Sequence, residues 1–391
     1  MDELSALPQT LARLQQQTHQ DFQVWICVNQ PEAWWHEATH FAVCERNRAL
    51  LQYLHNYQGL RLTILDRSSQ GQGWQGKRQG VGWARKTLFD TILQEAAADD
   101  LIVSLDADTC VRPPYLASLL HSFSLHPEWP ALAVPYYHPL SGNNLMDRAM
   151  LRYEIYMRNY AINMLLTDTL YQYTALGSAI VMRAGALQKI GGITPYQSGE
   201  DFYLLQKFCK MSSIGHTNDE MVYPATRLSD RVPFGTGPAI QKGMTEENNS
   251  YTVFHHSLWD AVRETAGMLQ LLYEKPLQTP FLDFLDAHSS NPDPWVPIRR
   301  NAKDLPHFIH AYHEKADGLR ILQFIRGQHA ASPLPDEQAL WENMQQWMPE
   351  RVPDWFSKET RFSDLSVTQM NRLRNLLLVC ERNLYKQKTH H

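Results

Sequence analysis

The chain has 391 residues, of which 43% are hydrophobic and 20% are charged, and its formal net charge is -5. This composition is typical of a globular protein with an ample core, and the net negative charge argues against bulk nucleic-acid affinity or a polybasic membrane anchor. The five cysteines are scattered, the N-terminal residues carry no apolar run, and no stretch approaches the roughly 20 apolar residues of a membrane helix. We therefore expect a soluble, cytoplasmic protein with reduced thiols.

Strand and helix patterns alternate along the first half of the chain. Helical spacing of apolar residues predicts helices over about 4–17, 45–57, 83–98 and 151–170, and a further helix that begins at 200. Short apolar runs predict strands over about 22–28, 62–65, 101–105, 131–135 and 179–182. This alternation predicts an α/β fold with a mainly parallel sheet flanked by crossover helices.

The second part of the chain has a different character. A stretch over 225–250 is rich in Gly, Pro, Asn and charge and predicts a loop or linker. From Ser257 onward only helical patterns occur, and Ser366-x-x-Gln369 has the spacing of a capping box. We therefore expect an α/β domain over 1–245 and a helical region over 246–391.

Two carboxylates follow the predicted strand over 101–105. Asp106 and Asp108 stand where its apolar run ends, and open α/β sheets bind ligands at that carboxyl edge. Two hard oxygen donors suit Mg²⁺ or Mn²⁺ carried on a phosphate. The alternative is a solvated turn at a strand end, and an Asp-x-Asp pair alone does not decide between the two.

A glycine-rich segment matches two phosphate-binding patterns incompletely. Gly71 to Gly76 reads G-x-G-x-x-G, but the polar stretch 66–70 separates it from the preceding strand, whereas a dinucleotide fingerprint follows its strand directly. Extended to Lys77 the segment reads G-x-x-x-x-G-K, but Arg78 stands where a Walker loop needs Ser or Thr. Both defects argue against a phosphate loop.

The segment from His36 to His40 is a literal H-E-x-x-H. Two histidines one helical turn apart can bind zinc, with Glu37 as general base. The segment follows a strand and two tryptophans instead of lying in a long helix, and no third ligand has the spacing of the extended motif. A surface helix is the alternative, and a zinc hydrolase using His36, Glu37 and His40 is the weaker enzymatic hypothesis.

The order of several modest motifs is more specific than any one of them. Along the chain come a Gly/Lys/Arg segment at 76–86, the Asp106/Asp108 pair, Gly-Gly at 191–192, Glu-Asp at 200–201 and an Arg-rich loop at 227–237. In this order the chain resembles the family 2 glycosyltransferases of GT-A fold, which use nucleotide sugars, over about residues 20–240. The loop Arg-x-Ser-x-Arg-Val-Pro-Phe-Gly-Thr-Gly is similar to that of a bacterial subgroup.

The resemblance implies roles for particular residues. Asp108 would bind Mn²⁺ or Mg²⁺, with Asp106 beside it on the metal or the ribose, and the ion would neutralise the leaving diphosphate. Asp201, supported by Glu200, would deprotonate the acceptor hydroxyl in an inverting single displacement. The expected donor-binding residues, several of them cations suited to a diphosphate, are Asn29, Lys77, Arg85, Asp106, Arg227 and Arg231.

The chain departs from the pattern of this family in two places. Members of the family open with a strand before the first helix, whereas this chain begins at or just before that helix, so we expect the sheet to lack its first strand. Asn29 stands where many relatives have a charged Asp. A non-catalytic nucleotide-sugar-binding or scaffold protein is therefore the alternative to a transferase.

The expected partners are a nucleotide-sugar donor and a saccharide or other hydroxyl acceptor, with no nucleic acid. Aromatic faces suit sugar stacking, although such residues are also common in cores. The residues expected to face the acceptor lie within 135–175 and are Tyr136, Tyr137, His138, Arg152, Tyr153, Tyr156 and Arg158. Acceptor binding, oligomerisation and peripheral membrane contact all stay open for the helical C-terminal region.

Overall fold

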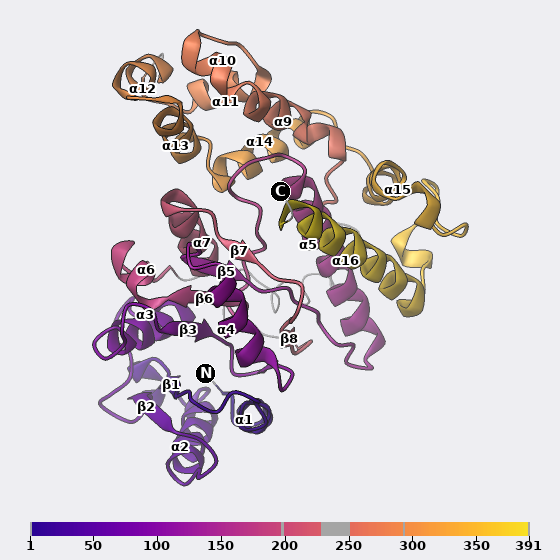
Figure 1. Cartoon of the computed structure of the whole chain (residues 1–391). Helices are drawn as coiled ribbons and strands as arrows, with labels where there is room; N and C mark the ends of the chain where they lie inside the picture. Colours follow the sequence, from indigo (N-terminus) through magenta and orange to yellow (C-terminus); the bar gives the residue numbers. More distant parts are fainter. Residues whose placement is uncertain (1, 197–198, 228–250, 292–293, 390–391) are drawn as a thin grey trace. The chain divides into compact units, whose positions relative to one another are not determined.

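The computed structural model describes residues 2–196, 199–227, 251–291 and 294–389, and Figure 1 shows their arrangement. The chain divides into two compact units. Unit 1 comprises Met1–Met146 and Ala175–Gln241, and unit 2 comprises Asp147–Thr174 and Lys242–His391. In the described part of the chain, no helix is both long enough and apolar enough to cross a membrane.

Unit 1 begins with two parallel strands and the helices that cover them. β1 (Val24–Asn29) pairs with β2 (Leu62–Arg67), with Val24 opposite Leu62 and Asn29 opposite Arg67. The helices are α1 (Leu7–Gln15), α2 (Phe41–His55) and α3 (Val81–Ile92). Leu11 of α1 and Leu50 and Leu54 of α2 bury against β1, as their helical spacing predicts. These elements lie close to their expected positions.

The remaining strands of unit 1 form a mixed sheet. Its strand order is β3 (Leu101–Ser104), β6 (Ile180–Arg183), β5 (Ala131–Ala133) and β7 (Gly215–His216). β6 runs antiparallel to both of its neighbours, and β5 runs parallel to β7. The expectation of a mainly parallel sheet is therefore wrong for the described strands. A short buried apolar run carries no directional signal, so the sequence could place β6 but not orient it.

Three further helices lie around this sheet. α4 (Tyr115–Leu125) follows β3 and has no counterpart among the predicted elements. α6 (Ala184–Lys189) follows β6 directly, and α7 (Glu200–Met211) begins at the predicted Glu-Asp pair. Among the described residues, β1 pairs only with β2 and β3 only with β6, so each of these strands ends its sheet.

Unit 2 is helical and includes a segment that the sequence analysis assigned to the first domain. α5 (Asn144–Leu165) begins in unit 1, but from Asp147 on it belongs to unit 2. The other helices among the described residues of unit 2 are η2 (His256–Trp259), α9 (Asp260–Gly267), α10 (Leu269–Glu274), α11 (Pro280–Ala287), α12 (Trp295–Asn301), α13 (Leu305–Lys315), α14 (Gly318–Ala331), α15 (Asp336–Trp347), η3 (Pro349–Arg351), η4 (Phe362–Asp364) and α16 (Val367–Thr389). α16 begins with the predicted capping box, because the Gln369 N–H donates to Ser366 Oγ and the Ser366 N–H donates to Gln369 Oε1.

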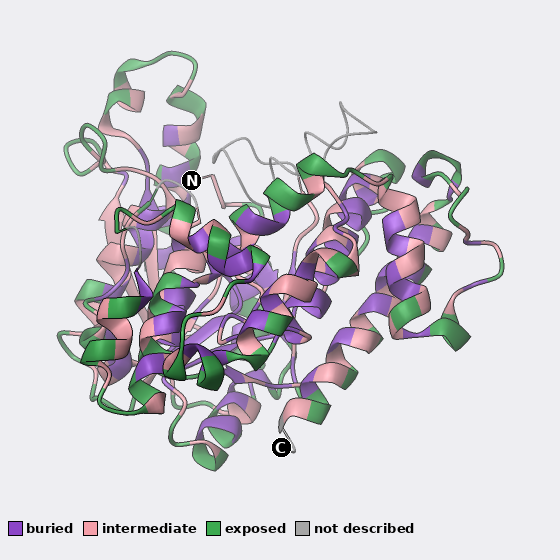
Figure 2. Ribbon diagram, turned by 90° about the horizontal axis from the view of Figure 1, so that it is seen from above, coloured by how far each residue is buried: buried purple, intermediate pink, exposed green. Residues whose placement is uncertain are grey.

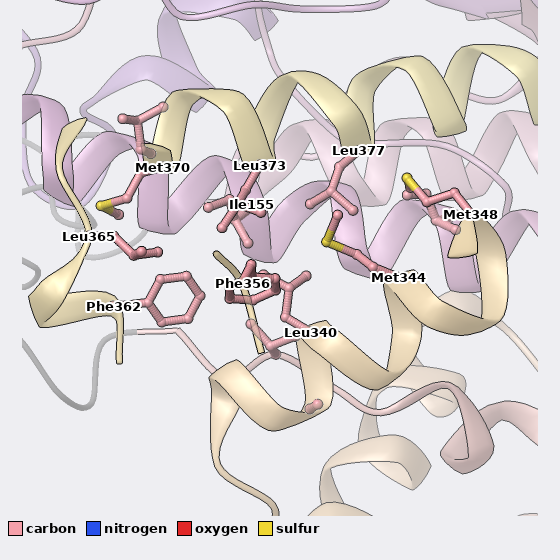
Figure 3. Close-up of a cluster of buried hydrophobic side chains, with 14 residues drawn as sticks. Ile155, Leu340, Met344, Met348, Phe356, Phe362, Leu365, Met370, Leu373 and Leu377 are labelled. Atoms are coloured by element: carbon pink, nitrogen blue, oxygen red, sulfur yellow. The ribbon is translucent and has the colours of Figure 1, made fainter. Parts of the chain in front are cut away.

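The core of unit 2 explains why 147–174 belongs there. Ile155 of α5 packs in one hydrophobic cluster with Leu340 of α15 and with Leu373 and Leu377 of α16 (Figure 3). In Figure 2 the buried residues line the inner faces of the helices, while exposed residues lie on loops and outer faces. A boundary drawn at residue 245 would separate α5 from the helices that cover it.

Buried charges also join α5 to α16. Glu154 accepts hydrogen bonds from Arg158 Nε at 3.1 Å and from Arg374 Nη1 at 2.8 Å. Arg158 Nη1 donates to Glu381 at 2.5 Å. All four side chains are buried, and their formal charges cancel, which is the condition under which buried ions are tolerated.

Candidate functional site

Arg85 connects two of the predicted site residues. It lies on α3, is only 9% exposed, and donates through Nη2 to Asp106 and through Nη1 to Glu200. Asp106 follows β3, and Glu200 opens α7 directly after Gly199, whose φ of 76° suits glycine. The guanidinium therefore holds together carboxylates that are 94 residues apart in sequence (200 - 106).

A glycine that the sequence analysis did not single out makes room for Arg85. A Cβ atom at Gly177 would lie well inside 3.0 Å of the Arg85 guanidinium, a separation that real Cβ atoms essentially never have. The same segment is anchored by Ser104 of β3, whose Oγ donates to the Gly177 carbonyl at 2.7 Å. Neither Ser104 nor Gly177 belongs to a recognisable motif, so only the fold identifies them.

The second predicted aspartate has its own arginine. β4 (Thr109–Cys110) pairs antiparallel with β8 (Tyr223–Pro224), and the Ala225 N–H extends this ladder to the Asp108 carbonyl at 3.2 Å. The ladder brings Arg227, two residues further on, beside Asp108. Arg227 Nε donates to the Asp108 carboxylate, and Nη2 donates to both carboxylate oxygens of Glu3 at 2.8 and 2.7 Å. Glu3 is another residue that no sequence motif indicated.

Burial raises the pKa of three acidic groups of the site. Burial raises the pKa of Asp108 above its ordinary value, and the charge of Arg227 opposes this effect. Burial likewise raises the pKa of Glu200 and of Asp201, in each case against the charge of Arg85. Asp108, Glu200 and Asp201 thus hold protons more strongly than free side chains do. A raised pKa is expected for a general base that works near neutral pH, although structural ion pairs also perturb pKa values.

The aspartate pair has the donors that a hard divalent cation prefers. One carboxylate oxygen each, Asp106 Oδ2 and Asp108 Oδ1, takes no part in the arginine contacts. The Asp106 side chain is 43% exposed and the Asp108 side chain 15%. No group of three or more His, Cys, Asp or Glu residues in the described chain is arranged to hold a metal. These residues fit an ion that shares its coordination with phosphate oxygens and water, as Mg²⁺ does.

Two other predicted donor-binding residues, Asn29 and Lys77, take no part in these arginine–carboxylate contacts. Asn29 is buried at the end of β1, where its Oδ1 accepts from Trp74 Nε1 at 3.2 Å. Lys77 is exposed on the loop before α3. Arg231 and the loop residues that follow it lie outside the described residues.

The glycine-rich loop binds an internal carboxylate. The N–H groups of Gly71 and Gly73 donate to the two carboxylate oxygens of Glu32, each at 2.8 Å. Backbone N–H groups of this kind would cradle the phosphates in a phosphate loop. Glu32 takes that place here, which is consistent with the defects of both phosphate-binding patterns.

The H-E-x-x-H segment does not form a zinc site. His36 ends a 3-10 helix, η1 (Glu32–His36), and His40 precedes α2, so the two histidines do not lie one turn apart on a helix. His40 stacks on Trp34 with ring centroids 4.5 Å apart, and its Nδ1 lies 2.7 Å from the Glu37 carboxylate. The zinc hydrolase hypothesis is therefore wrong, because a break between helices separates the ligands it needs.

The residues expected to face an acceptor fall into both units. In unit 1, Tyr136 and His138 are buried. In unit 2, Arg152 pairs with Asp336 at 2.7 Å and Arg158 lies in the buried charge cluster. The expectation is wrong for these two arginines, whose charges are used within the helical core. Tyr153 and Tyr156 pack against Tyr251, with ring centroids 4.7 and 5.3 Å apart.

No protein-family model and no curated protein matches the sequence. Two solved structures of S. aureus TarS align with it. One, of TarS 1-349, has 12% identity and a TM-score of 0.38 and covers 100% of this chain and 89% of its own. The other has 13% identity and a TM-score of 0.40 and covers 98% of this chain and 52% of its own, so this chain spans about half of its length. Similarity this low establishes neither a shared fold nor a shared activity.

Proposed function

We propose that the protein is a glycosyltransferase of the GT-A, family 2 kind. It would move a sugar from a UDP- or GDP-sugar to an acceptor hydroxyl, with a divalent cation and with inversion. The observation that carries this proposal is the ion-pair network in unit 1: Arg85 joins Asp106 to Glu200, and Arg227 holds Asp108. The fold brings together the two carboxylate pairs that the motif order assigned to metal binding and to proton transfer.

The residues of the site divide the chemistry between them. Asp106 and Asp108 would hold Mn²⁺ or Mg²⁺, which when bound would neutralise charge on the leaving diphosphate. Asp201 lies at the first turn of α7 and would accept the proton of the acceptor hydroxyl. Arg85 holds Glu200 and Asp106 and lowers the pKa of Asp201 against the effect of burial, which keeps that carboxylate available as a base. Arg227 would add positive charge beside the diphosphate.

Donor binding is the first test of the proposal. UDP-, GDP- and TDP-sugars would be screened by thermal shift with and without Mn²⁺, because a ligand that binds only the folded state raises the melting temperature. A shift with one nucleotide that depends on Mn²⁺ and disappears in Asp108→Asn would support the donor site. No shift with any donor would contradict it.

Turnover separates an enzyme from a binding protein. With the donor that binds, and with water or an added saccharide as the acceptor of the sugar, Asp201→Asn should keep the thermal shift. It should lose about 10²–10⁴ in the rate of donor cleavage, which is the usual contribution of a general base. Asp90→Asn, which removes a carboxylate at the surface of α3, is the matched control and should leave the rate unchanged. Donor binding without cleavage by the unsubstituted protein would instead favour the non-catalytic nucleotide-sugar-binding alternative.

A further inference from the structure

Arg227 is shared between carboxylates from two distant parts of the chain. Nε binds Asp108 in the turn before β4, and Nη2 binds both oxygens of Glu3, which precedes α1. The side chains of Arg227, Glu3 and Asp108 are 30%, 13% and 15% exposed. Charge-assisted contacts that are partly buried in this way are stronger and less screened than surface ion pairs.

Glu3 is held in place independently of Arg227. Arg46 of α2 binds the neighbouring Asp2 with two hydrogen bonds of 2.6 and 2.8 Å, and the Asp2 N–H donates to Asn47 Oδ1 at 3.1 Å. The Glu3 carbonyl accepts from the N–H of Leu7 at 3.0 Å, at the start of the buried helix α1. The backbone of Glu3 is thus fixed to the body of unit 1.

A cation bound at Asp108 would compete with Arg227. The guanidinium already neutralises this carboxylate, and two cations on one partly buried carboxylate repel each other strongly. Glu3 offers Arg227 a second anchor that does not involve Asp108. Arg227 Nη1 takes part in neither contact, so an arginine held by Glu3 alone would have both Nε and Nη1 available for another anion.

We propose that Arg227 is an internal cation that neutralises Asp108 until a divalent cation binds there, and that Glu3 is a positioning residue that retains Arg227 afterwards. This inference rests on the proposed function, which places the cation at Asp108. Metal binding would release Nε from Asp108, and the arginine would stay beside the site, on Glu3, to contact the diphosphate. Glu3 acts through Arg227 and touches neither the ion nor the donor.

The test measures Mn²⁺ affinity by titration calorimetry of the whole chain without nucleotide. Four proteins are compared: the unsubstituted chain, Arg227→Gln, Glu3→Asp and the double variant. Arg227→Gln should bind Mn²⁺ about tenfold more tightly, because a competing charge has been removed. Glu3→Asp keeps the negative charge but shortens its reach, so it should weaken Mn²⁺ binding several-fold by leaving Arg227 on Asp108. In the Arg227→Gln background, Glu3→Asp should have no effect.

Two surface variants are the matched controls. Arg61→Gln makes the same charge change as Arg227→Gln, and Glu128→Asp makes the same shortening as Glu3→Asp. Both lie at exposed ion pairs of unit 1 and should leave Mn²⁺ affinity unchanged. Thermal unfolding of each protein without metal confirms that it is folded.

The outcomes separate the inference from the proposed function. The inference is wrong if Arg227→Gln binds Mn²⁺ no more tightly than the unsubstituted chain. It is also wrong if Glu3→Asp has the same effect with and without Arg227→Gln. Neither result would contradict the proposed turnover of the donor. If none of the four proteins binds Mn²⁺ while donor cleavage proceeds, the proposed roles of Arg227 and Glu3 are wrong, and so is the proposed metal site. The proposed glycosyltransferase activity would not be contradicted. If neither Mn²⁺ nor any donor binds, both proposals fail.

Discussion

The surroundings of Arg85 determine which groups its guanidinium binds. Its motif placed it among the cations for the diphosphate, but it is buried and both Nη groups donate to carboxylates. A buried guanidinium is stable only when anions surround it, so Asp106 and Glu200 are as necessary to Arg85 as it is to them. Its contact with a donor stays a prediction. The sequence indicated all three residues but not that they bind one another.

Substitution of Gly177 tests this network at the level of one methyl group. Gly177→Ala should push the Arg85 guanidinium off its carboxylates, because the new Cβ atom would overlap it. We expect a loss of about 1–3 kcal/mol in the free energy of unfolding, as for other overpacked sites. Urea denaturation would measure it. Gly327→Ala in α14 is the control, since a Cβ at that position would meet no atom within 4 Å other than those of its chain neighbours and its own helix backbone. Equal stability of Gly177→Ala and the unsubstituted chain would show that Arg85 is not confined.

The raised pKa of Asp201 predicts the acid side of the pH–rate profile. A base must be ionised, and burial raises the pKa of this carboxyl above its ordinary 3.8. The rate of donor cleavage should therefore begin to fall, as the pH is lowered, at a pH above 3.8. In Arg85→Met, which removes a charge that lowers the pKa of Asp201, the acid limb should move to higher pH. A limb that stays in place would argue against Asp201 as the base.

The same shifts predict the sign of a stability effect. Because the pKa values of Asp108, Glu200 and Asp201 are raised on folding, the folded state binds protons more strongly than the unfolded chain. Their contribution to stability is fully present below the unfolded pKa values and is lost as the pH rises through the folded ones.

At the scale of elements, buried charge joins α5 to α16. Glu154→Gln would leave Arg158 and Arg374 without their shared carboxylate, and breaking a buried ion pair typically costs about 3–5 kcal/mol. We expect a loss of that size in the free energy of unfolding, measured by denaturation with urea. Asp260→Asn, which breaks an exposed pair with Arg263, should cost no more than about 1 kcal/mol. Similar effects of the two substitutions would mean that the buried cluster contributes little.

The sequence predicted where helices and strands lie along the chain better than it predicted how they pair and pack. The capping box at Ser366 and the apolar face of α1 are local patterns, and the structure confirms both. β6 runs antiparallel to β3 and β5, and a short buried strand does not encode the direction of its neighbours. The sequence analysis also assigned α5 to the first domain, whereas α5 from Asp147 on belongs to unit 2. The apolar face of a helix does not indicate which other element it packs against.

At the scale of the whole molecule, the chain passes between the units more than once, since 147–174 belongs to unit 2 and 175–241 to unit 1. A fragment of residues 1–245 should therefore be insoluble or bind hydrophobic dyes. Leu151, Ile155 and Ile162 of α5 would lose the cluster that buries them, at a cost of about 1.5–3 kcal/mol for each side chain. Sedimentation of the expressed fragment measures this outcome.

Co-expression provides the control for that fragment. Residues 246–391 supplied as a separate chain carry α15 and α16, the main partners of α5, and should restore solubility by covering its apolar face. A soluble, monomeric fragment 1–245 without them would contradict the division of the chain.

By itself the sequence determined an α/β segment followed by helices, the acidic pairs Asp106/Asp108 and Glu200/Asp201, and the failure of the phosphate-loop patterns, because these depend on local spacing and residue chemistry. Only the tertiary structure decided which charges meet. It placed Arg85 on Asp106 and Glu200, Arg227 between Asp108 and Glu3, and Gly177 against the Arg85 guanidinium. Such contacts join residues far apart in the chain, and they form because a buried charge is stable only beside its counter-charge, wherever the fold brings one.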